Sequence, residues 1–502
     1  MATDSASPRT AGKPSPGTAK ALGLTSATTL VMGIMIGSGI FVVSPEIARE
    51  VGSPGLLMLV WVVTGVMTLM GALCYGELAA AMPQAGGQYV YLREALGPLW
   101  AFLFGWTLFI VIQTGTIAAV CVAFAKYLGV LYPHSVSEST WLFHWGHLGP
   151  VQLGVNTEEL VAIAVILFLT WLNTRGVRSG ALVQNVFTFA KIAALVGLIL
   201  VGLAIARNAG AIAANFSHFW HQFFSGFWGH GLYNLSGAAN GKMVSTATIV
   251  AVFAALVGSL FSSDAWNNVT YTAGEIRNPR RNLPLSLAIG TIAVTALYLL
   301  ANLAYLSVLQ FPGIAHAPED RVASAMLGAA YGPLGAVLIA VAILISTFGC
   351  TNGLILAGPR VFQAMAKDGL FFKKAAQLNR LQVPATALWI QGIWACILCL
   401  SGTYTDLLNY VMFTEFIFYI LTISSLFVLR RKRPELERPY KVVAYPWLPA
   451  VYIALAVFFD AVVLWVFPQY SSSGLVLVLI GVPVYFLWGR PGKPKPAAAE
   501  LS

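Results

Sequence analysis

The chain has 502 residues, of which 58% are apolar and only 10% are charged. Soluble proteins carry roughly 25% charged residues, so this composition excludes a soluble enzyme, a secreted disulfide-framework protein and a disordered scaffold. It predicts an all-α polytopic membrane protein, because a helix satisfies its own backbone groups and crosses a bilayer with about 20 apolar residues.

Residues 1–20 are rich in Ser, Pro, Gly and Lys and lack the apolar run of a signal peptide, which predicts a disordered cytoplasmic tail. Twelve apolar runs bounded by turn residues follow this tail and are predicted to be spanning helices. Their approximate ranges are 24–50, 55–82, 98–128, 158–175, 180–206, 244–275, 284–310, 333–362, 384–402, 406–430, 446–467 and 474–489.

The distribution of Lys and Arg predicts the orientation of these spans, because cytoplasmic loops carry an excess of both residues. With the N-terminal tail in the cytoplasm, 23 of the 29 Lys and Arg fall on the cytoplasmic side and five on the outer side, and Lys191 lies within a span. We therefore expect both termini in the cytoplasm of a plasma-membrane protein. The net charge of +10 is then a topology signal, and no nucleic-acid partner is expected.

The first span is interrupted by the sequence Gly33-Ile-Met-Ile-Gly37-Ser38-Gly39-Ile40-Phe41. Glycines around a serine weaken a helix, and unpaired backbone groups are costly in hydrocarbon unless they line a polar cavity. The alternative is a close helix-packing face formed by Gly33 and Gly37.

The sixth span contains Phe261-Ser262-Ser263-Asp264-Ala265-Trp266-Asn267-Asn268. An ionisable residue near the membrane centre, among serines and asparagines, indicates a functional site. The alternative is that the span ends near Leu260 and that the polar run lies in a loop.

The first and sixth spans hold corresponding places in two five-span halves of opposite orientation. Paired broken helices at such places indicate a transporter site between inverted repeats. Helix N-termini offer N–H groups to an anion and helix C-termini offer carbonyls to a cation. The pattern therefore predicts a zwitterionic ligand such as an amino acid.

Four motifs carry a family resemblance between about residues 21 and 440. The chain resembles the amino acid–polyamine–organocation (APC) superfamily, and within it the L-type amino acid transporter branch and its bacterial homologues. The motifs are Ile36–Phe41, Pro83–Tyr89 with Gly97-Pro98, Phe261–Asn268 with Gly274–Pro279, and Phe348–Gly353.

The resemblance implies a LeuT-like fold of 12 transmembrane helices, with a 5+5 inverted repeat and broken helices 1 and 6. The expected division is a tail (1–20), a first five-helix repeat (21–206), an extracellular loop (207–243), a second repeat (244–430), peripheral helices 11 and 12 (431–489) and a cytoplasmic tail (490–502).

The resemblance also implies a set of substrate-binding residues. The N–H groups of Gly37, Ser38 and Gly39 would hold a substrate carboxylate, and carbonyls near the two breaks would hold its ammonium. Phe261 would act as an aromatic gate. The whole set is Met35, Gly37, Ser38, Gly39, Ile40, Phe261, Ser262, Asp264, Trp266 and Asn267.

Lys191 lies in the fifth span, where a charge is expensive. One interpretation is a lysine that snorkels to the interface. The resemblance implies instead that it stands in for a sodium ion and ties the first span to the eighth, near Ser346 and Cys350. Sodium dependence is therefore not expected, whereas exchange with a fixed lysine charge and symport with a cycling proton both stay open.

Three acidic residues in the spans need separate interpretations. Asp264 stands where many family members have a small residue, and it would favour cationic substrates, pair with Lys191, take a proton or cap the second half-helix. Glu415 is either structural or on the permeation path. Glu77, near the cytoplasmic end of its span, is predicted to form an interfacial ion pair with an arginine.

The favoured function is secondary transport of L-amino acids, neutral ones first, by alternating access. The alternatives are a carrier of cationic amino acids or polyamines, and a non-transporting amino-acid receptor. The resemblance implies that a heavy chain would be linked through a cysteine in the outer loop between the third and fourth spans. Residues 129–156 contain no cysteine, so no disulfide-linked heavy chain is expected. We expect no enzymatic activity and no cofactor. We also expect no metal site, because the pairs His144/His147 and His218/His221 fit aromatic interfacial loops better than metal binding.

Overall fold

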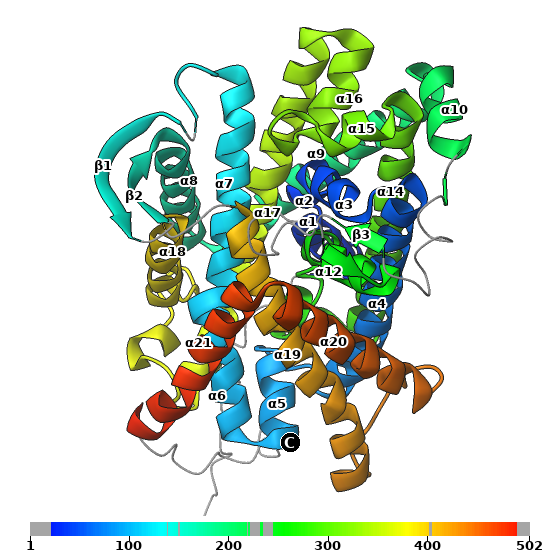
Figure 1. Cartoon of the computed structure of the whole chain (residues 1–502). Helices are drawn as coiled ribbons and strands as arrows, with labels where there is room; N and C mark the ends of the chain where they lie inside the picture. Colours follow the sequence, from blue (N-terminus) through cyan, green and yellow to red (C-terminus); the bar gives the residue numbers. More distant parts are fainter. Residues whose placement is uncertain are drawn as a thin grey trace, which may run out of the picture.

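In the computed structural model of the chain, the described residues are 22–137, 139–148, 151–217, 219–220, 231–233, 244–400 and 404–488. Both predicted tails lie outside these residues, and so do parts of the predicted outer loop 207–243 and the side chains of both histidine pairs. The described residues form a bundle of helices, most of which run up and down in the view of Figure 1.

Ten helical segments of the described residues are long and apolar enough to cross a membrane, so the chain is a multi-pass membrane protein. Two further predicted spans contain the shorter apolar helices α12 (Thr248–Ser262) and α18 (Ala385–Cys399). The ten segments comprise α1 (Leu24–Met35) with α2 (Gly39–Val42), α4 (Pro54–Ala81), α6 (Pro98–Thr107) with η1 (Leu108–Ile112) and α7 (Gln113–Leu131), α8 (Thr157–Thr174), α9 (Val177–Leu200) with η2 (Val201–Ile205), α14 (Pro279–Val308), α17 (Pro333–Lys367), α19 (Tyr404–Lys432), α20 (Trp447–Val466) and α21 (Pro468–Trp488).

Shorter helices and two antiparallel hairpins connect these segments. The hairpins pair β1 (Trp141–Leu148) with β2 (Val151–Asn156) and β3 (Gly231–Tyr233) with β4 (Val244–Thr246), and they are an addition to the predicted helical architecture. The short helices are α3 (Ser44–Val51), α5 (Gln88–Leu96), α10 (Ala209–Ser217), α13 (Asn268–Tyr271), η4 (Ala273–Glu275), α15 (Phe311–Ala315), η5 (Pro318–Asp320), α16 (Val322–Tyr331) and η6 (Lys373–Ala376).

Two helices begin earlier than the sequence predicts. α14 begins at Pro279, because Asn278 adopts a left-handed conformation that stops the preceding chain and proline suits the first helical position. α21 begins at Pro468 rather than near 474. Its polar start is accommodated because the hydroxyls of Ser471 and Ser473 donate to carbonyls four residues back, at 3.1 and 2.8 Å.

The packing places α1 in the interior of the bundle. α4 and α14 pack along each other, α17 packs against α7 and α9, and α1 contacts α14, α9 and α17. Large apolar side chains such as Phe189 and Leu338 remain about 60% exposed (59% and 60%), as expected for a surface that lipid covers. The interruption in α1 is therefore held by helices that themselves face lipid.

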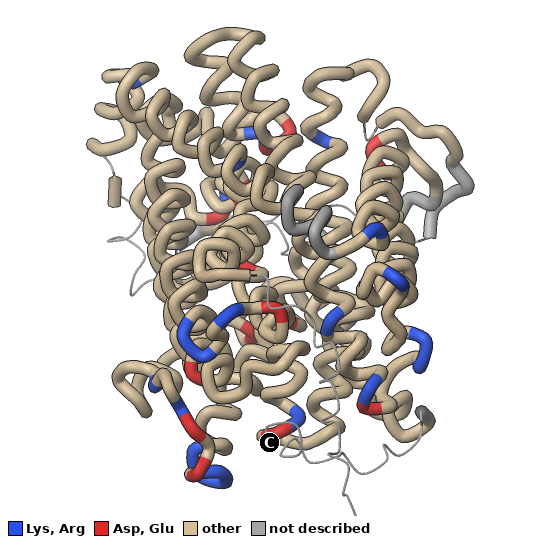
Figure 2. Tube along the Cα trace, turned by 180° about the vertical axis from the view of Figure 1, so that it is seen from behind, with Lys and Arg blue, Asp and Glu red and all other residues tan. Residues whose placement is uncertain are grey.

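Most Lys and Arg lie in the lower half of the view in Figure 2. The last turns of α5 and α19 carry basic residues, Arg93 in α5 and Arg430, Arg431 and Lys432 in α19. The predicted ion pair of Glu77 is confirmed there: Arg430 of α19 donates to both Glu77 oxygens, at 2.9 and 2.6 Å. The Val442 N–H donates to the same carboxylate at 2.8 Å. These contacts join α4, α19 and the segment before α20 at one end of the molecule.

Candidate substrate site

The first break separates α1 from α2 at the predicted glycines. α1 ends at Met35, Ile36 has a non-helical ψ of 90°, and α2 begins at Gly39. The last carbonyls of a helix and the first amides of the next have no intrahelical partners. The break therefore presents carbonyls of α1 and amides of α2 inside the protein, where they need partners.

Lys191 of α9 supplies a cation to the carbonyls of this break. Its Nζ donates to the Gly33 carbonyl at 2.7 Å and to the Ile36 carbonyl at 2.8 Å, and the side chain is 1% exposed. A snorkelling lysine would reach the interface instead, so that interpretation is wrong.

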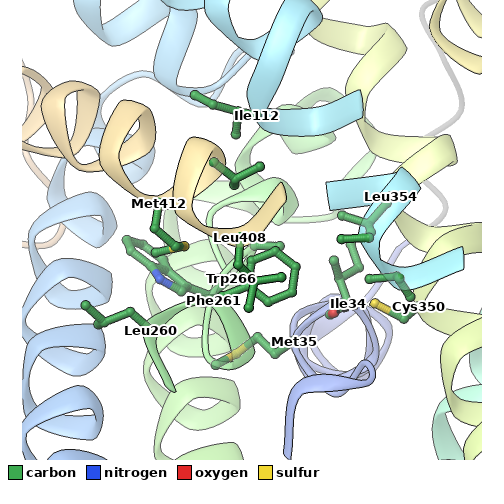
Figure 3. Close-up of a cluster of buried hydrophobic side chains, with 14 of the residues drawn as sticks. Ile34, Met35, Ile112, Leu260, Phe261, Trp266, Cys350, Leu354, Leu408 and Met412 are labelled. Carbon is green, nitrogen blue, oxygen red and sulfur yellow. Dashed lines mark hydrogen bonds between the residues drawn. The ribbon is translucent and has the colours of Figure 1, made fainter. Parts of the chain in front are cut away.

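α17 contributes two more donors, to neighbouring carbonyls of the same break. The Ser346 hydroxyl donates to Gly37 at 3.2 Å, and the Cys350 thiol donates to Ile34 at 2.9 Å. Figure 3 shows Cys350 beside Ile34. The structure thus brings Lys191, Ser346 and Cys350 together around the end of α1.

The second break separates α12 from α13. α12 ends at Ser262, α13 begins at Asn268, and Ala265 between them has a left-handed φ of 61°. A non-glycine residue rarely adopts this conformation. The alternative that the span ends near Leu260 is close to the observed end of α12. The polar run that follows is nevertheless buried inside the bundle, with Ser262 and Asp264 at 3% and 6% exposure.

Three predicted site residues within this break contact α19 and α5. The Tyr419 hydroxyl of α19 donates to Asp264 at 2.6 Å, and the Trp266 ring stacks on that of Tyr419. The Asn267 amide donates to Gln88 of α5 at 3.1 Å. Asp264 is therefore not paired with Lys191, which removes one of its four predicted roles.

The two breaks meet at Tyr298 of α14. Its hydroxyl lies 3.0 Å from the Met35 carbonyl and 3.0 Å from the Ser262 carbonyl. Gly39 lies directly against Ser262, and a Cβ atom on Gly39 would be 2.9 Å from the Ser262 Cα. The C-terminal ends of two half-helices thus converge on one point, where no side chain on Gly39 would fit.

Phe261 occupies the space between α1, α12 and α19 (Figure 3). Its ring lies among apolar side chains that include Ile34, Leu354, Leu408 and Met412 and is 7% exposed. This arrangement encloses the first break with apolar surface.

Tyrosine hydroxyls are the site groups that the sequence analysis missed. Besides Tyr298 and Tyr419, Tyr305 donates to the Ile40 carbonyl at 3.2 Å and Tyr127 donates to the Phe41 carbonyl at 2.9 Å. The available signal was the spacing of Tyr298 and Tyr305, seven residues apart and therefore on one face of an apolar helix.

A network at the lower end in Figure 1 ties α5 to the end of α17. Asp368 accepts from the Tyr89 hydroxyl at 2.8 Å and from Arg93 at 2.5 Å. Burial, and then the charge of Asp368, raise the pKa of Tyr89 above its ordinary value, so its hydroxyl stays protonated and remains a donor.

Comparison with known proteins relates this geometry to a family. The amino acid permease family matches residues 22–487. The chain belongs to the amino acid permease family. This membership confirms the resemblance predicted from the four motifs, and it identifies a membrane transporter of amino acids rather than an enzyme.

Individual relatives agree with this family. The b(0,+)-type amino acid transporter 1 of Homo sapiens is 31% identical over 481 residues, which cover 93% of this chain and 88% of that protein. Its Mus musculus counterpart is 30% identical over 475 residues, with the same two coverages. The large neutral amino acids transporter small subunit 2 of Homo sapiens is 31% identical over 474 residues, 93% of this chain and 80% of that protein.

Proposed function

We propose that this permease is a sodium-independent secondary active transporter that moves L-amino acids, neutral ones first, across the plasma membrane by alternating access. The observation that carries the proposal is the contact of Lys191 Nζ with the Gly33 and Ile36 carbonyls. A cation is already provided at the unwound end of α1, so a sodium ion is not needed there. Exchange and proton-coupled symport are both compatible with this contact.

The substrate would bind at the two breaks. Its carboxylate would accept from the N–H groups of Gly37, Ser38 and Gly39, and its ammonium would donate to carbonyls near Met35 and Ser262. The convergence of those two carbonyls on the Tyr298 hydroxyl supports this arrangement, because a donor at that point already serves both. Phe261 would gate the site, with Ile40, Asp264, Trp266 and Asn267 around it.

The proposed topology has twelve spans, with repeats at 21–206 and 244–430, an extracellular loop at 207–243 and peripheral helices at 431–489. Both termini, with tails 1–20 and 490–502, would lie in the cytoplasm. Ten long apolar helices and two shorter ones within the predicted spans support this topology. Basic residues in the last turns of α5 and α19 support the orientation.

The relatives' names bear on substrate and partners. A relative named for large neutral amino acids supports neutral substrates. Cationic amino acids or polyamines, and binding without transport, are the alternatives. We propose a chain without a disulfide-linked partner, because its five cysteines are buried or half-buried in the described residues and none lies in 129–156.

Uptake of labelled amino acids into proteoliposomes tests the proposal. We expect neutral L-amino acids to enter without sodium, and to enter faster when unlabelled substrate is present inside if the protein exchanges. Empty liposomes provide the background. Neither uptake nor binding of any amino acid would contradict the substrate class, and binding without uptake would identify a receptor.

A further inference from the structure

Two buried carboxyl groups lie next to each other beside the second break. Asp264 follows α12 and Glu415 belongs to α19, and they are 6% and 3% exposed. Glu415 lies one turn before Tyr419 on α19, and the Tyr419 hydroxyl donates to Asp264 at 2.6 Å, so the two carboxyl groups lie around one tyrosine. Since two carboxyl groups buried in one environment can share a proton, the pair has the chemistry of a proton-binding site.

No cation neutralises this pair. Within the described part of the chain, neither carboxyl forms a salt bridge with Lys, Arg or His. Lys191 is engaged with the carbonyls of α1. Other titratable groups interact electrostatically with the pair or with the tyrosines around it, and they come from α4, α5, α13, α19 and α20. These groups are Cys74, Tyr75, Tyr91, Tyr271, Tyr419, Tyr452 and Asp460.

The electrostatic consequence is one retained proton. Two adjacent carboxylates in a low-dielectric interior repel each other strongly, and neither gains from a neighbouring positive charge. The pair therefore keeps one proton while it is enclosed. It can lose that proton only when water or a cation reaches it.

Unpartnered polar atoms extend from the pair along α4 and α19. One oxygen of Glu415, the Tyr75 hydroxyl and the Thr422 hydroxyl are buried without a hydrogen-bond partner among the described residues. The pair therefore has buried polar neighbours on α4 and α19.

Asp264 faces α4, α19 and α20. A small cavity against Asp264 is lined by Thr68 of α4, Ser263, Trp266, Tyr419 of α19 and Tyr452 of α20, and no residue of α1 lines it. The ammonium of a substrate bound at the breaks would face α1 instead. A proton is therefore the ligand that the position favours over the cationic group of a substrate.

We propose that Asp264 and Glu415 bind one proton per transport cycle and couple amino-acid uptake to the proton gradient. This inference rests on the proposed function and chooses symport over exchange. On the outer side a proton from water forms an O–H bond with the carboxylate pair. On the inner side that bond breaks and the proton returns to water, while Lys191 keeps its charge throughout.

A pH gradient across proteoliposomes tests the coupling. A gradient of about two pH units, acidic outside, is about 2.7 kcal/mol and permits about 100-fold accumulation at one proton per substrate. We expect the wild type to accumulate a neutral amino acid in proteoliposomes that contain no amino acid at the start. Glu415→Gln and Asp264→Asn should lose this gradient-driven accumulation, whereas Asp460→Asn, which removes a buried carboxyl of α20 outside the pair, should keep it.

Other outcomes separate the two proposals. Wild-type exchange that ignores the pH gradient would overturn the coupling but leave the transport function intact, whereas absence of all wild-type uptake would overturn the function. Variants that lose only cationic substrates would make the pair a substrate subsite and overturn the coupling. If the variants do not fold, wild-type protein in weakly buffered detergent should take up about one proton when substrate binds, and no proton uptake would contradict the inference.

Discussion

Lys191→Ala is expected to abolish amino-acid uptake. The substitution removes the cation that holds the Gly33 and Ile36 carbonyls. The Ile36 carbonyl would keep only the Ser346 hydroxyl, at 3.4 Å. Each buried acceptor that loses its donor costs about 1–3 kcal/mol, so the two losses together predict a fall in transport rate of about 30-fold or more. The measurement is the initial rate of uptake of a labelled neutral amino acid into proteoliposomes.

Lys126→Ala is the matched control for this prediction. Lys126 is a half-exposed lysine of α7, so its truncation tests the loss of a lysine outside the site. We expect it to transport at nearly the wild-type rate. Lys191→Arg keeps the charge but changes the shape of the donor, and it should retain part of the activity. Wild-type uptake by Lys191→Ala would refute the proposed role of the lysine.

Gly39→Ala is expected to stop transport for a steric reason. Its added methyl group would overlap the Ser262 side chain and lie 2.9 Å from the Ser262 Cα. The contact would separate α2 from α12 at the point where the two breaks meet. Alanine is more favourable than glycine in a helix by about 1 kcal/mol. A lower stability of Gly39→Ala therefore could not come from helix propensity and would point to the steric contact. Uptake and the thermal unfolding temperature of the purified protein measure the effect.

Gly197→Ala provides the comparison for the steric argument. Gly197 lies in α9, and nothing is within 4 Å of the Cβ that it would gain. This variant should keep its transport activity and equal or exceed the wild type in stability. If both alanine variants behave alike, the close approach of Gly39 and Ser262 does not matter for transport.

The sequence predicts best the features whose burial in a membrane costs free energy. Glycines beside a serine in an apolar run predicted the interruption after Met35, and Lys191 stood out because a buried charge needs a partner. The partners Ser346 and Cys350 came from the family resemblance rather than from periodicity. The amino acid permease match confirms the family itself.

The direction in which the side chains of the second break point was not predictable from the sequence. The chain turns at Ala265, whose left-handed conformation lets Asp264 before it and Trp266 after it both contact Tyr419 of α19. A single alanine carries no signal for such a turn, since glycine and asparagine are the usual residues there. The pairing with Glu415 depends on this turn and was missed for the same reason.

Backbone-directed tyrosines and short hairpins were missed for another reason. Tyr298 and Tyr305 bond to carbonyls of α1 and α2, more than 250 residues away in sequence, at separations of 263 and 265 residues. Tyrosine is common in spanning helices, so its presence does not identify a carbonyl partner. The β1–β2 hairpin lies in an aromatic-rich loop whose composition equally fits an interfacial segment.

Uptake of a labelled neutral L-amino acid into proteoliposomes, with sodium present or fully replaced by a large organic cation, is the most direct test of sodium-independent transport. We predict equal initial rates in the two buffers, because Lys191 already occupies the end of α1 with a cation. Uptake that requires sodium would contradict the proposed role of Lys191 and the transport mechanism based on it.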